Sequence, residues 1–415
     1  MRAVLVVRSF PKVSTTFILN KMLGLRDRDV DVHLVCWTSE DAAWVRFPDA
    51  ANDADLRRRI HLVPTLDRPA AGWALARNLA MGTLVAKRPF GRSGLTVLLS
   101  ALQPDVVHFE FGSSAAPYLA TESDASRDER PVVVSFRGHD LNCVGLGNPK
   151  FYDGVWRRAD ALHCLGDDLW QRALRRGCPP SKPHVLIPPA VDTMVFVPDP
   201  RPLVEIGTVE RPLHLLSVGR LHWKKGHRFG LAAIRSLRDR GIMVEHHVIG
   251  DGPDCDEIMA RAHDLGVTDA VRFLGPRSRS EVMSAMQWAD AFLHPSVSEG
   301  FCNAVMEAQS MELPVVCSDA DGLPENVADG VTGFVVPRRD EEAISDALVA
   351  LARDRQLRAR MGKAGRERVA SMFRPEHQID AFAKLYETVV DGRLDDLAAP
   401  EPTQEFAMGT WKKGP

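Results

Sequence analysis

The sequence predicts an α/β protein made of two doubly wound domains, each built around a parallel sheet. Short apolar runs rich in Val, Ile and Leu alternate along the chain with longer segments of helical periodicity. A Pro-rich, charged stretch at residues 197–212 interrupts this alternation once, and a second series follows it. The 415 residues, of which 45% are hydrophobic, suffice for two globular domains.

The first predicted domain covers residues 1–196. After the first strand, a helix is expected to bury Phe17, Ile18 and Met22, whereas the polar residues 38–59 are expected to be irregular. The predicted strands of this domain are Ala3–Val7, Val32–Cys36, Ile60–Val63, Val106–Phe109, Val132–Phe136, Ala161–Leu165 and Val185–Ile187.

Residues 70–102 form an apolar, helical segment that also carries basic side chains, among them Arg77 and Lys87. A helix packed against the sheet is the favoured interpretation. The alternative is an amphipathic helix at a membrane surface, which would place a cytoplasmic protein peripherally at the inner face of the membrane. No apolar run approaches the ~20 residues that a membrane-spanning helix needs.

Charge and cysteine content argue against other classes of protein. A formal net charge of −3 argues against a nucleic-acid-binding protein, because phosphate backbones require a concentrated basic surface. The seven cysteines are scattered, odd in number and without a C-x-x-C pair. They fit the reduced thiols of a cytoplasmic protein better than disulfides or a zinc site.

The second predicted domain covers residues 213–375, after a linker at residues 197–212. Residues 341–390 have helical periodicity, and residues 391–415 are expected to be a loosely held tail. The predicted strands of this domain are Leu213–Val218, Val244–Ile249, Val271–Leu274, Ala291–Leu293, Val315–Cys317 and Gly333–Val336.

One βαβ unit of the second domain carries the first candidate ligand site. The strand Ala291–Leu293 leads into a loop with Glu299, and a helix from about Asn303 carries Glu307. In parallel sheets ligands bind at the carboxyl ends of strands, and a helix N-terminus at that place suits a phosphate. Carboxylates would repel an anion and suit hydroxyls instead. The pattern therefore predicts a ligand with both groups, a nucleotide or a sugar nucleotide.

A second candidate site follows the strand Leu213–Val218. Gly219 ends that strand and lets the backbone approach a ligand closely. Arg220, Lys224 and Lys225 come next, before a helix. Arg offers phosphate oxygens a planar fork and Lys a point charge, so the stretch is a candidate diphosphate clamp. A solvated basic loop is the alternative.

These residues resemble the motifs of glycosyltransferase family 4. Gly219–Gly226 is similar to the family's G-R-L-x-x-K-K-G phosphate motif, and Glu299–Glu307 is similar to its paired-glutamate motif, with the same spacing. The resemblance is strong over residues 213–340 and weaker but collinear in the first domain. Further stretches that agree in order are Ile249–Pro253, Val271–Gly275, Gly322–Glu325, Asp329–Gly333, Val191–Phe196 and Ser14–Phe17, the last resembling a polysaccharide-assembling branch.

The resemblance implies a GT-B fold, in which two Rossmann-like domains face each other across a cleft. It implies transfer from a nucleotide diphosphate sugar with retention at the anomeric carbon, without a bound metal or a cofactor. Arg220 and Lys225 would neutralise the leaving diphosphate, and Glu307 would hold the ribose hydroxyls. Glu299, placed among the catalytic residues, would hold the transferred sugar together with the backbone of Gly300, Phe301 and Cys302. The further donor-binding residues that the resemblance implies are Gly219, Gly300, Phe301, Cys302 and Asn303.

The first domain departs from the family's pattern after the strand Val132–Phe136. Many relatives carry F-H-G-x-D there, whereas this chain has Arg137 in the place of the His, followed by His139 and Asp140. Glu110 also stands where relatives often have His. His139 is predicted to be catalytic near the acceptor, or else to cap a turn. The acceptor-side candidates are Arg137, Asp140, Glu110 and Thr16.

The sequence thus predicts a retaining glycosyltransferase that transfers a hexose-type sugar to a hydroxyl of a saccharide or lipid-linked acceptor, in polysaccharide or glycoconjugate biosynthesis. The alternatives are a sugar-nucleotide epimerase on the same fold and a catalytically silent nucleotide-sugar-binding protein. Asp254 and Asp256 have the D-x-D spacing of metal-dependent glycosyltransferases, but they open a helix, so a capping role is predicted. Residues 376–390 resemble the family's crossover helix, which returns to the first domain; a simple terminal helix is the alternative.

Overall fold

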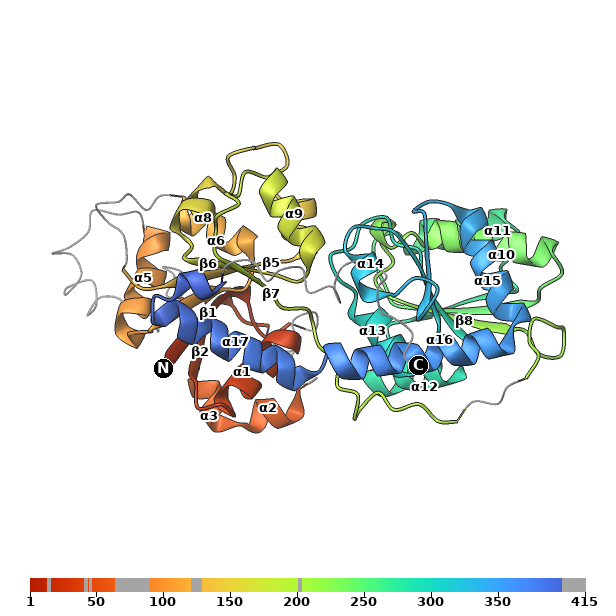
Figure 1. Cartoon of the computed structure of the whole chain (residues 1–415), viewed down its shortest axis with the longest axis horizontal. Helices are drawn as coiled ribbons and strands as arrows, with labels where there is room; N and C mark the ends of the chain where they lie inside the picture. Colours follow the sequence, from red (N-terminus) through yellow and green to blue (C-terminus); the bar gives the residue numbers. More distant parts are fainter. Residues whose placement is uncertain are drawn as a thin grey trace. The chain divides into compact units, whose positions relative to one another are not determined.

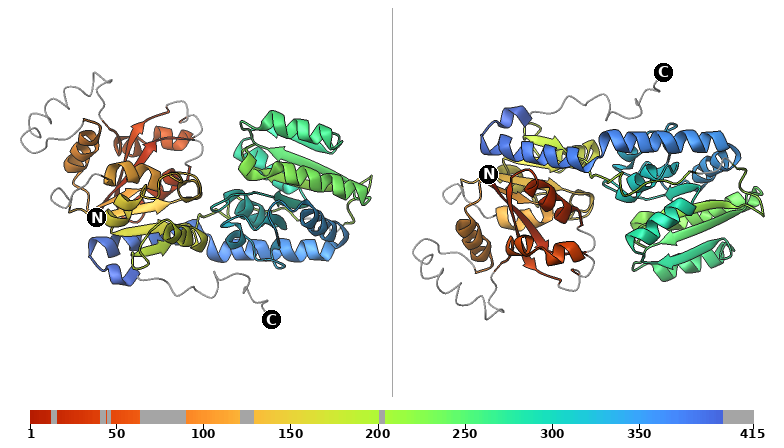
Figure 2. Two further views of the ribbon diagram at one scale, coloured as in Figure 1. Left: turned by 90° about the horizontal axis from the view of Figure 1, so that it is seen from above. Right: turned by 90° about the horizontal axis from the view of Figure 1, so that it is seen from below.

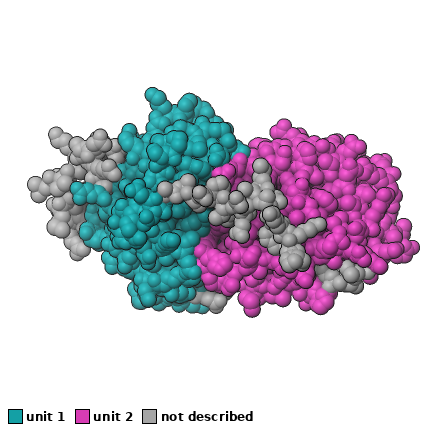
Figure 3. Space-filling model, in the orientation of Figure 1, with its two compact units in different colours: residues 1–165, 170–187, 379–400 teal, residues 166–169, 188–378, 401–415 magenta. Residues whose placement is uncertain are grey.

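A computed structural model of the chain describes residues 1–12, 16–40, 44, 47–63, 90–120, 129–200 and 204–397. The chain divides into two compact units (Figures 1 and 3). The first unit comprises Met1–Leu165, Trp170–Ile187 and Ile379–Pro400, and the second comprises Gly166–Leu169, Pro188–Gln378 and Glu401–Pro415. Each unit therefore combines segments that are far apart in the sequence.

The first unit is built on a parallel sheet in the order β3-β2-β1-β4-β5-β6-β7. The central strand β1 is almost continuously buried, and parallel strands covered on both faces have continuous apolar sequences for that reason. The strands described in this unit are β1(Arg2–Ser9), β2(Asp31–Thr38), β3(Ile60–Leu62), β4(Val106–Phe109), β5(Val132–Phe136), β6(Ala161–Cys164) and β7(His184–Leu186).

The first unit also contains the last long helix of the chain, α17(Pro375–Val390), from Ile379 onward. Its Ile379, Phe382 and Tyr386 lie in the apolar core that β1 and α1 form. In both views of Figure 2 the blue α17 lies along the elements of this unit, next to its yellow segments. The other helices described here are α1(Thr16–Arg26), α2(Pro48–Asn52), α3(Ala54–Arg58), α5(Phe90–Leu102), α6(Gly112–Leu119), α7(Gly138–Asn142), α8(Asp153–Arg158), most of α9(Asp167–Arg175), and η5(Leu394–Leu397).

The second unit has its own parallel sheet, in the order β10-β9-β8-β11-β12-β13. Its described strands are β8(Leu213–Val218), β9(Val244–Ile249), β10(Val271–Gly275), β11(Ala291–His294), β12(Val315–Ser318) and β13(Gly333–Val336). Its described helices are η4(Trp223–Lys225), α10(His227–Asp239), α11(Cys255–Asp264), α12(Arg279–Trp288), α13(Asn303–Ser310), α14(Leu323–Asn326), α15(Glu341–Arg353) and α16(Arg355–Met372).

In each sheet the strand order reverses beside the first strand. β8 lies between β9 and β11 in the second unit, and β1 lies between β2 and β4 in the first. Connections leave in opposite directions at such a point, so a crevice opens at the carboxyl ends of the two strands, and ligands of open α/β sheets bind there. Side chains that follow β8 and β11, or β1 and β4, are therefore the candidates for ligand contact.

The predicted α/β class with two parallel sheets is confirmed, and the strands lie within one or two residues of their predicted ends. The prediction that residues 38–59 are irregular is wrong where α2 and α3 form. Asp53 supports this local helix, because its carboxylate accepts a hydrogen bond from the backbone N–H of Leu56 and caps α3.

The predicted helix at residues 70–102 is confirmed for α5, which begins at Phe90. Residues 70–89, with Arg77 and Lys87, lie outside the described residues, as do Ser14 and most of the predicted tail. None of the helices that the structure describes is long and apolar enough to cross a membrane.

Candidate active site

Two loops meet at the crevice of the second unit, one after β8 and one after β11. The backbone N–H of Val297 donates to the Lys224 carbonyl over 2.7 Å, which joins the loops directly. Gly226 ends η4 and precedes α10 with φ +66°, and a Cβ atom at this position would lie 1.9 Å from the Pro295 carbonyl oxygen. A glycine is required here, because both the left-handed backbone and the close approach exclude a side chain.

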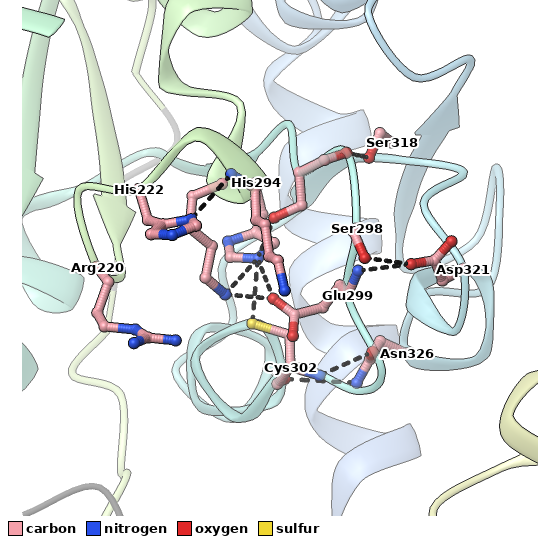
Figure 4. A network of polar contacts seen from close by, with 12 residues as sticks. Arg220, His222, His294, Ser298, Glu299, Cys302, Ser318, Asp321 and Asn326 are labelled. Atoms are coloured by element: carbon pink, nitrogen blue, oxygen red, sulfur yellow. Dashed lines mark hydrogen bonds and ion pairs between the residues drawn. The ribbon is translucent and has the colours of Figure 1, made fainter. Parts of the chain in front are cut away.

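The loops bring four polar side chains into one cluster (Figure 4). The Lys225 ammonium forms an ion pair with the Glu299 carboxylate, and the two side chains are 19% and 17% exposed. Nε2 of the buried His294 lies 3.5 Å from Lys225 Nζ and 3.4 Å from Glu299 Oε2. The thiol of Cys302 lies 3.3 Å from the same nitrogen. The cluster thus holds a carboxylate, an ammonium, an imidazole and a thiol within contact distance.

The charges of this cluster stabilise one another. Burial raises the pKa of Glu299, but Lys225 and His294 outweigh it and bring that pKa to about 2. Burial lowers the pKa of His294, and the Cys302 thiol more than offsets it, so the imidazole pKa is raised. Burial raises the pKa of the Cys302 thiol, but His294 and Lys225 outweigh burial and lower that pKa. At neutral pH the Glu299 side chain is therefore a carboxylate.

A second layer of hydrogen bonds holds the loop of Glu299. The Asp321 carboxylate accepts from the Ser298 hydroxyl over 2.8 Å and from the backbone N–H of Glu299 over 3.0 Å. Asn326 accepts from the Cys302 N–H over 3.2 Å, and its amide donates to the Cys302 carbonyl over 3.4 Å. These contacts place the predicted Gly300 and Phe301, both buried, in a loop whose backbone is held at both ends.

Arg220 and Glu307 stand apart from this network. Arg220 is exposed, and its guanidinium forms no hydrogen bond or ion pair with the residues that the structure describes. Glu307 lies on α13, is partly buried, and makes no side-chain hydrogen bond with described residues. Burial raises its pKa to about 7, against the opposing charge of Arg279. A cation and a carboxyl group thus remain available to a ligand, while Gly219 ends β8 and the exposed Asn303 begins α13.

The described residues contain one group that could hold a metal ion, and it is this same cluster. Ligand atoms of His294, Glu299 and Cys302 lie within 4.8 Å of one another. The Lys225 ammonium, however, contacts both the carboxylate and the imidazole, so a cation already occupies the electrostatic centre of the group.

The predicted capping role of Asp254 is wrong for its side chain. Asp254 stands at the N-cap position of α11, but its carboxylate makes no capping hydrogen bond. It accepts instead from the backbone N–H of Trp223, in the loop after β8. Asp256 lies in the first turn of α11. Asp254 therefore attaches α11 to the loop after β8.

The acceptor-side candidates of the first unit form a separate group. Glu110 follows β4, is fully buried, and accepts from Lys21 Nζ over 2.7 Å and from an Arg137 guanidinium nitrogen over 3.1 Å. Asp140 is buried and accepts from the backbone N–H groups of Ser113 and Arg137 over 2.9 and 3.0 Å. The structure thus brings together Arg137, Glu110 and Asp140.

His139 and Thr16 do not join this group. His139 is an exposed residue of α7, and its imidazole makes no hydrogen bond with the residues described. Thr16 is the exposed first residue of α1. The interpretation of His139 as a turn cap has no support, because the capping box of α7 involves Arg137 and Asp140.

Sequence reasoning missed Lys21 and His294. Lys21 is only 2% exposed, and it lies four residues after Phe17 and four before Leu25, on the side of α1 that was expected to be buried. This spacing was the signal that could have identified it. His294 directly ends the strand that leads to Glu299, so its position at the carboxyl end of β11 was a comparable signal.

Two family models match the chain in succession. The one described as "Glycosyl transferase 4-like domain" matches residues 14–189, and the one described as "Glycosyl transferases group 1" matches residues 204–368. The GDP-mannose-dependent alpha-(1-6)-phosphatidylinositol monomannoside mannosyltransferase of Mycobacterium tuberculosis is 33% identical over 86% of this chain and 89% of its own. The amylovoran biosynthesis glycosyltransferase AmsK of Erwinia amylovora is 26% identical over 93% and 99%.

A solved structure of Anabaena Alr3699/HepE, in complex with UDP and glucose, is similar in fold. It has a TM-score of 0.70 at 16% sequence identity and covers 94% of this chain and 100% of its own. The predicted GT-B fold is thereby confirmed. With a 33% identical relative across most of its length, and with the two family models matched in order, the chain belongs to glycosyltransferase family 4.

Proposed function

We propose that this glycosyltransferase moves a hexose-type sugar from a nucleotide diphosphate sugar to a hydroxyl of a saccharide or lipid-linked acceptor, with retention at the anomeric carbon. The setting that its relatives favour is the biosynthesis of a polysaccharide or glycoconjugate, since AmsK is named for amylovoran biosynthesis and the mycobacterial relative for a phosphatidylinositol mannoside. A lipid-linked acceptor would bring the enzyme to a membrane surface.

The observation that carries this proposal is the arrangement at the crevice between β8 and β11. Lys225 and Glu299 form a mostly buried ion pair there, and Arg220 and Glu307 have no partner among the described residues. Cations suit a diphosphate, and carboxylates suit the hydroxyls of ribose and of the sugar. HepE, which has this fold, was solved with UDP and glucose bound, and this supports a nucleotide sugar as the donor.

The proposed chemistry exchanges one bond at the anomeric carbon for another. The bond to the diphosphate oxygen breaks and the bond to the acceptor hydroxyl oxygen forms. The nucleoside diphosphate leaves with the bonding electrons and takes up the proton that the acceptor hydroxyl loses. Arg220 and the ammonium of Lys225 would stabilise the negative charge that develops on this leaving group. Glu299 is then free to accept hydrogen bonds from sugar hydroxyls, because Lys225 turns toward the diphosphate.

The donor site predicts two binding defects. Lys225→Ala and Glu307→Ala should each weaken nucleotide-sugar binding by about tenfold or more, because each removes a charge-assisted contact of roughly 1.5–3 kcal/mol. Calorimetry with UDP-glucose and GDP-mannose, on the full chain, measures the affinity. Lys363→Ala is the matched control, since Lys363 is 75% exposed on α16. Unchanged affinity in both site variants would refute the donor assignment.

We also propose that transfer requires neither a metal ion nor a cofactor. The Lys225 ammonium supplies positive charge where metal-dependent enzymes place a cation, so activity should survive treatment with EDTA. Nucleotide release with and without chelator, followed by metal analysis of the purified protein, checks this prediction. A loss of activity that zinc restores would instead assign a metal to His294, Glu299 and Cys302.

Acceptor dependence separates this function from its alternatives. A transferase releases nucleotide in proportion to the acceptor that it glycosylates. A sugar-nucleotide epimerase would convert the donor without any acceptor, and a silent binding protein would bind the donor and release nothing. Product analysis of donor incubations with and without saccharide acceptors therefore distinguishes the three.

A further inference from the structure

The crevice of the first unit carries a charged group of its own. Glu110 directly follows β4, Arg137 directly follows β5, and Lys21 lies on the helix that follows β1. β1 and β4 are the strands between which the order of this sheet reverses. The group therefore stands at the place where open α/β sheets bind their ligands.

Among the described residues, the carboxylate oxygens of Glu110 and Asp140 each have a hydrogen-bond donor. One oxygen of Glu110 accepts from Lys21 and the other from Arg137. The two oxygens of Asp140 accept from the backbone N–H groups of Ser113 and Arg137. Each of these four oxygens thus has one hydrogen-bond donor inside the protein, and Lys21 and Arg137 offset the charge of Glu110.

The guanidinium of Arg137, by contrast, has donors left over. Only one of its nitrogens is bonded to Glu110, and its Nε atom is buried without a hydrogen-bond partner among the described residues. A buried N–H group without an acceptor is costly, so such groups in native proteins call for a ligand or water. The side chain as a whole is 17% exposed, so part of it is open to a ligand, although Nε itself is enclosed.

Aromatic rings hold this guanidinium in place. Its central carbon lies 3.8 Å from the centre of the Phe17 ring and 5.5 Å from that of Phe111. The Glu110 carboxylate is in turn fixed by Lys21, whose ammonium lies 3.5 Å from the centre of the Phe382 ring. The planar fork of Arg137 is therefore oriented before any ligand arrives, which reduces the entropy that binding must overcome.

We propose that Arg137 binds an anionic group of the sugar acceptor, a carboxylate or a phosphate, and that it makes the enzyme select acidic over neutral acceptors. This inference rests on the proposed transferase function, because it names the class of acceptor. Acceptor-only oxygens match the leftover donors, and a guanidinium binds carboxylate and phosphate through paired hydrogen bonds.

The test compares matched acidic and neutral probes by ligand-observed NMR on the full chain, with UDP or GDP held at saturation. Methyl β-D-glucuronide against methyl β-D-glucoside tests a carboxylate, and α-D-glucose 1-phosphate against methyl α-D-glucoside tests a phosphate. We expect at least one acidic probe to bind about tenfold more tightly than its neutral counterpart, and Arg137→Gln to abolish that difference.

Two further variants make the result specific. Arg157→Gln on α8 removes an exposed arginine of the same unit and should leave the preference intact. Arg137→Lys keeps the charge without the fork and should give an intermediate preference. The Arg137→Gln protein should fold, because Glu110 keeps Lys21 as its partner and the remaining buried pair is neutral.

The outcomes separate this inference from the proposed function. Equal binding of acidic and neutral probes by the wild-type chain overturns the inference, and so does an Arg137→Gln variant that retains the acidic preference. If nucleotide binding is present in the same samples, the proposed function survives that result. If no nucleotide sugar binds while an acidic preference remains, the donor assignment fails and the anion site stands.

Discussion

The carboxyl group of Glu307 has a pKa of about 7 because it is buried without a hydrogen-bond partner among the described residues. A raised pKa means that the folded protein holds this proton more tightly than the unfolded chain, so ionisation costs stability as pH rises from about 4.5 to 7. The ionised form is the better acceptor for ribose hydroxyls. We therefore expect nucleotide affinity to increase by several-fold between pH 6 and pH 8.

Calorimetric titrations across that pH range check this expectation. Glu307→Gln should bind weakly with a flat pH profile, because the amide does not ionise in this range. Glu342→Gln, at a side chain that is 82% exposed on α15, should keep the wild-type slope. A flat pH profile of nucleotide affinity in the wild-type chain would contradict the assignment of Glu307 to the ribose hydroxyls.

At the scale of single residues, the sequence indicated candidate side chains but not the contacts that they make. Glu299, Lys225 and Glu307 stand out because their spacing resembles a family motif. The ion pair of Lys225 with Glu299 joins residues 74 positions apart, so only the strand order brings them together. Lys21 was overlooked because a lysine on a helix is ordinarily solvated, and its burial depends on a carboxylate from β4.

The connection between η4 and α10 requires a glycine at position 226. We expect Gly226→Ala to lower the free energy of unfolding by about 1–3 kcal/mol more than Gly241→Ala does. Gly241 has φ +76° and nothing within 4 Å of an added Cβ, so that variant isolates the cost of the left-handed backbone. Gly226→Ala adds the collision with Pro295.

Chemical denaturation of both variants gives the difference, and nucleotide binding provides a second readout. The collision pushes the loop of Lys225 away from the loop of Glu299. Only Gly226→Ala should therefore also weaken the binding of the nucleotide-sugar donor. Equal stability losses in the two variants would mean that the loops tolerate the displacement.

At the scale of elements, buried strands were the most predictable features. Parallel strands that are covered on both faces are largely apolar. The sequence therefore identifies β1, β8 and β11 by their apolar runs. α2 and α3 were not visible, because each has only five residues and little apolar periodicity. The role of Asp254 was mistaken for a related reason: its carboxylate bonds to Trp223, 31 residues away, rather than to its own helix.

For the molecule as a whole, α17 completes the apolar core of the first unit. Phe382 is buried against Lys21, His108, His163 and Tyr386. Phe382→Ala should therefore destabilise the first unit by about 3–5 kcal/mol. Glu387→Ala, at an exposed position of the same helix, should have little effect.

Denaturation followed by hydrogen exchange assigns the loss to one unit. Amides of β1 and β4 should lose protection in Phe382→Ala, whereas those of β8 and β11 should keep it. Equal loss in both sheets would show that the units unfold as one. The fold class was predictable from the alternation of strands and helices, but the return of α17 rested on resemblance alone, because periodicity does not indicate which sheet a helix covers.

The division of the first unit between the two ends of the chain has a consequence for synthesis on the ribosome. Residues 1–165 emerge early, but Ile379, Phe382 and Tyr386 complete their core only after the core of the second unit has been made. The core of the second unit ends at Met361. The half that is translated first is thus finished last, and until then it exposes an apolar surface that a chaperone would have to cover.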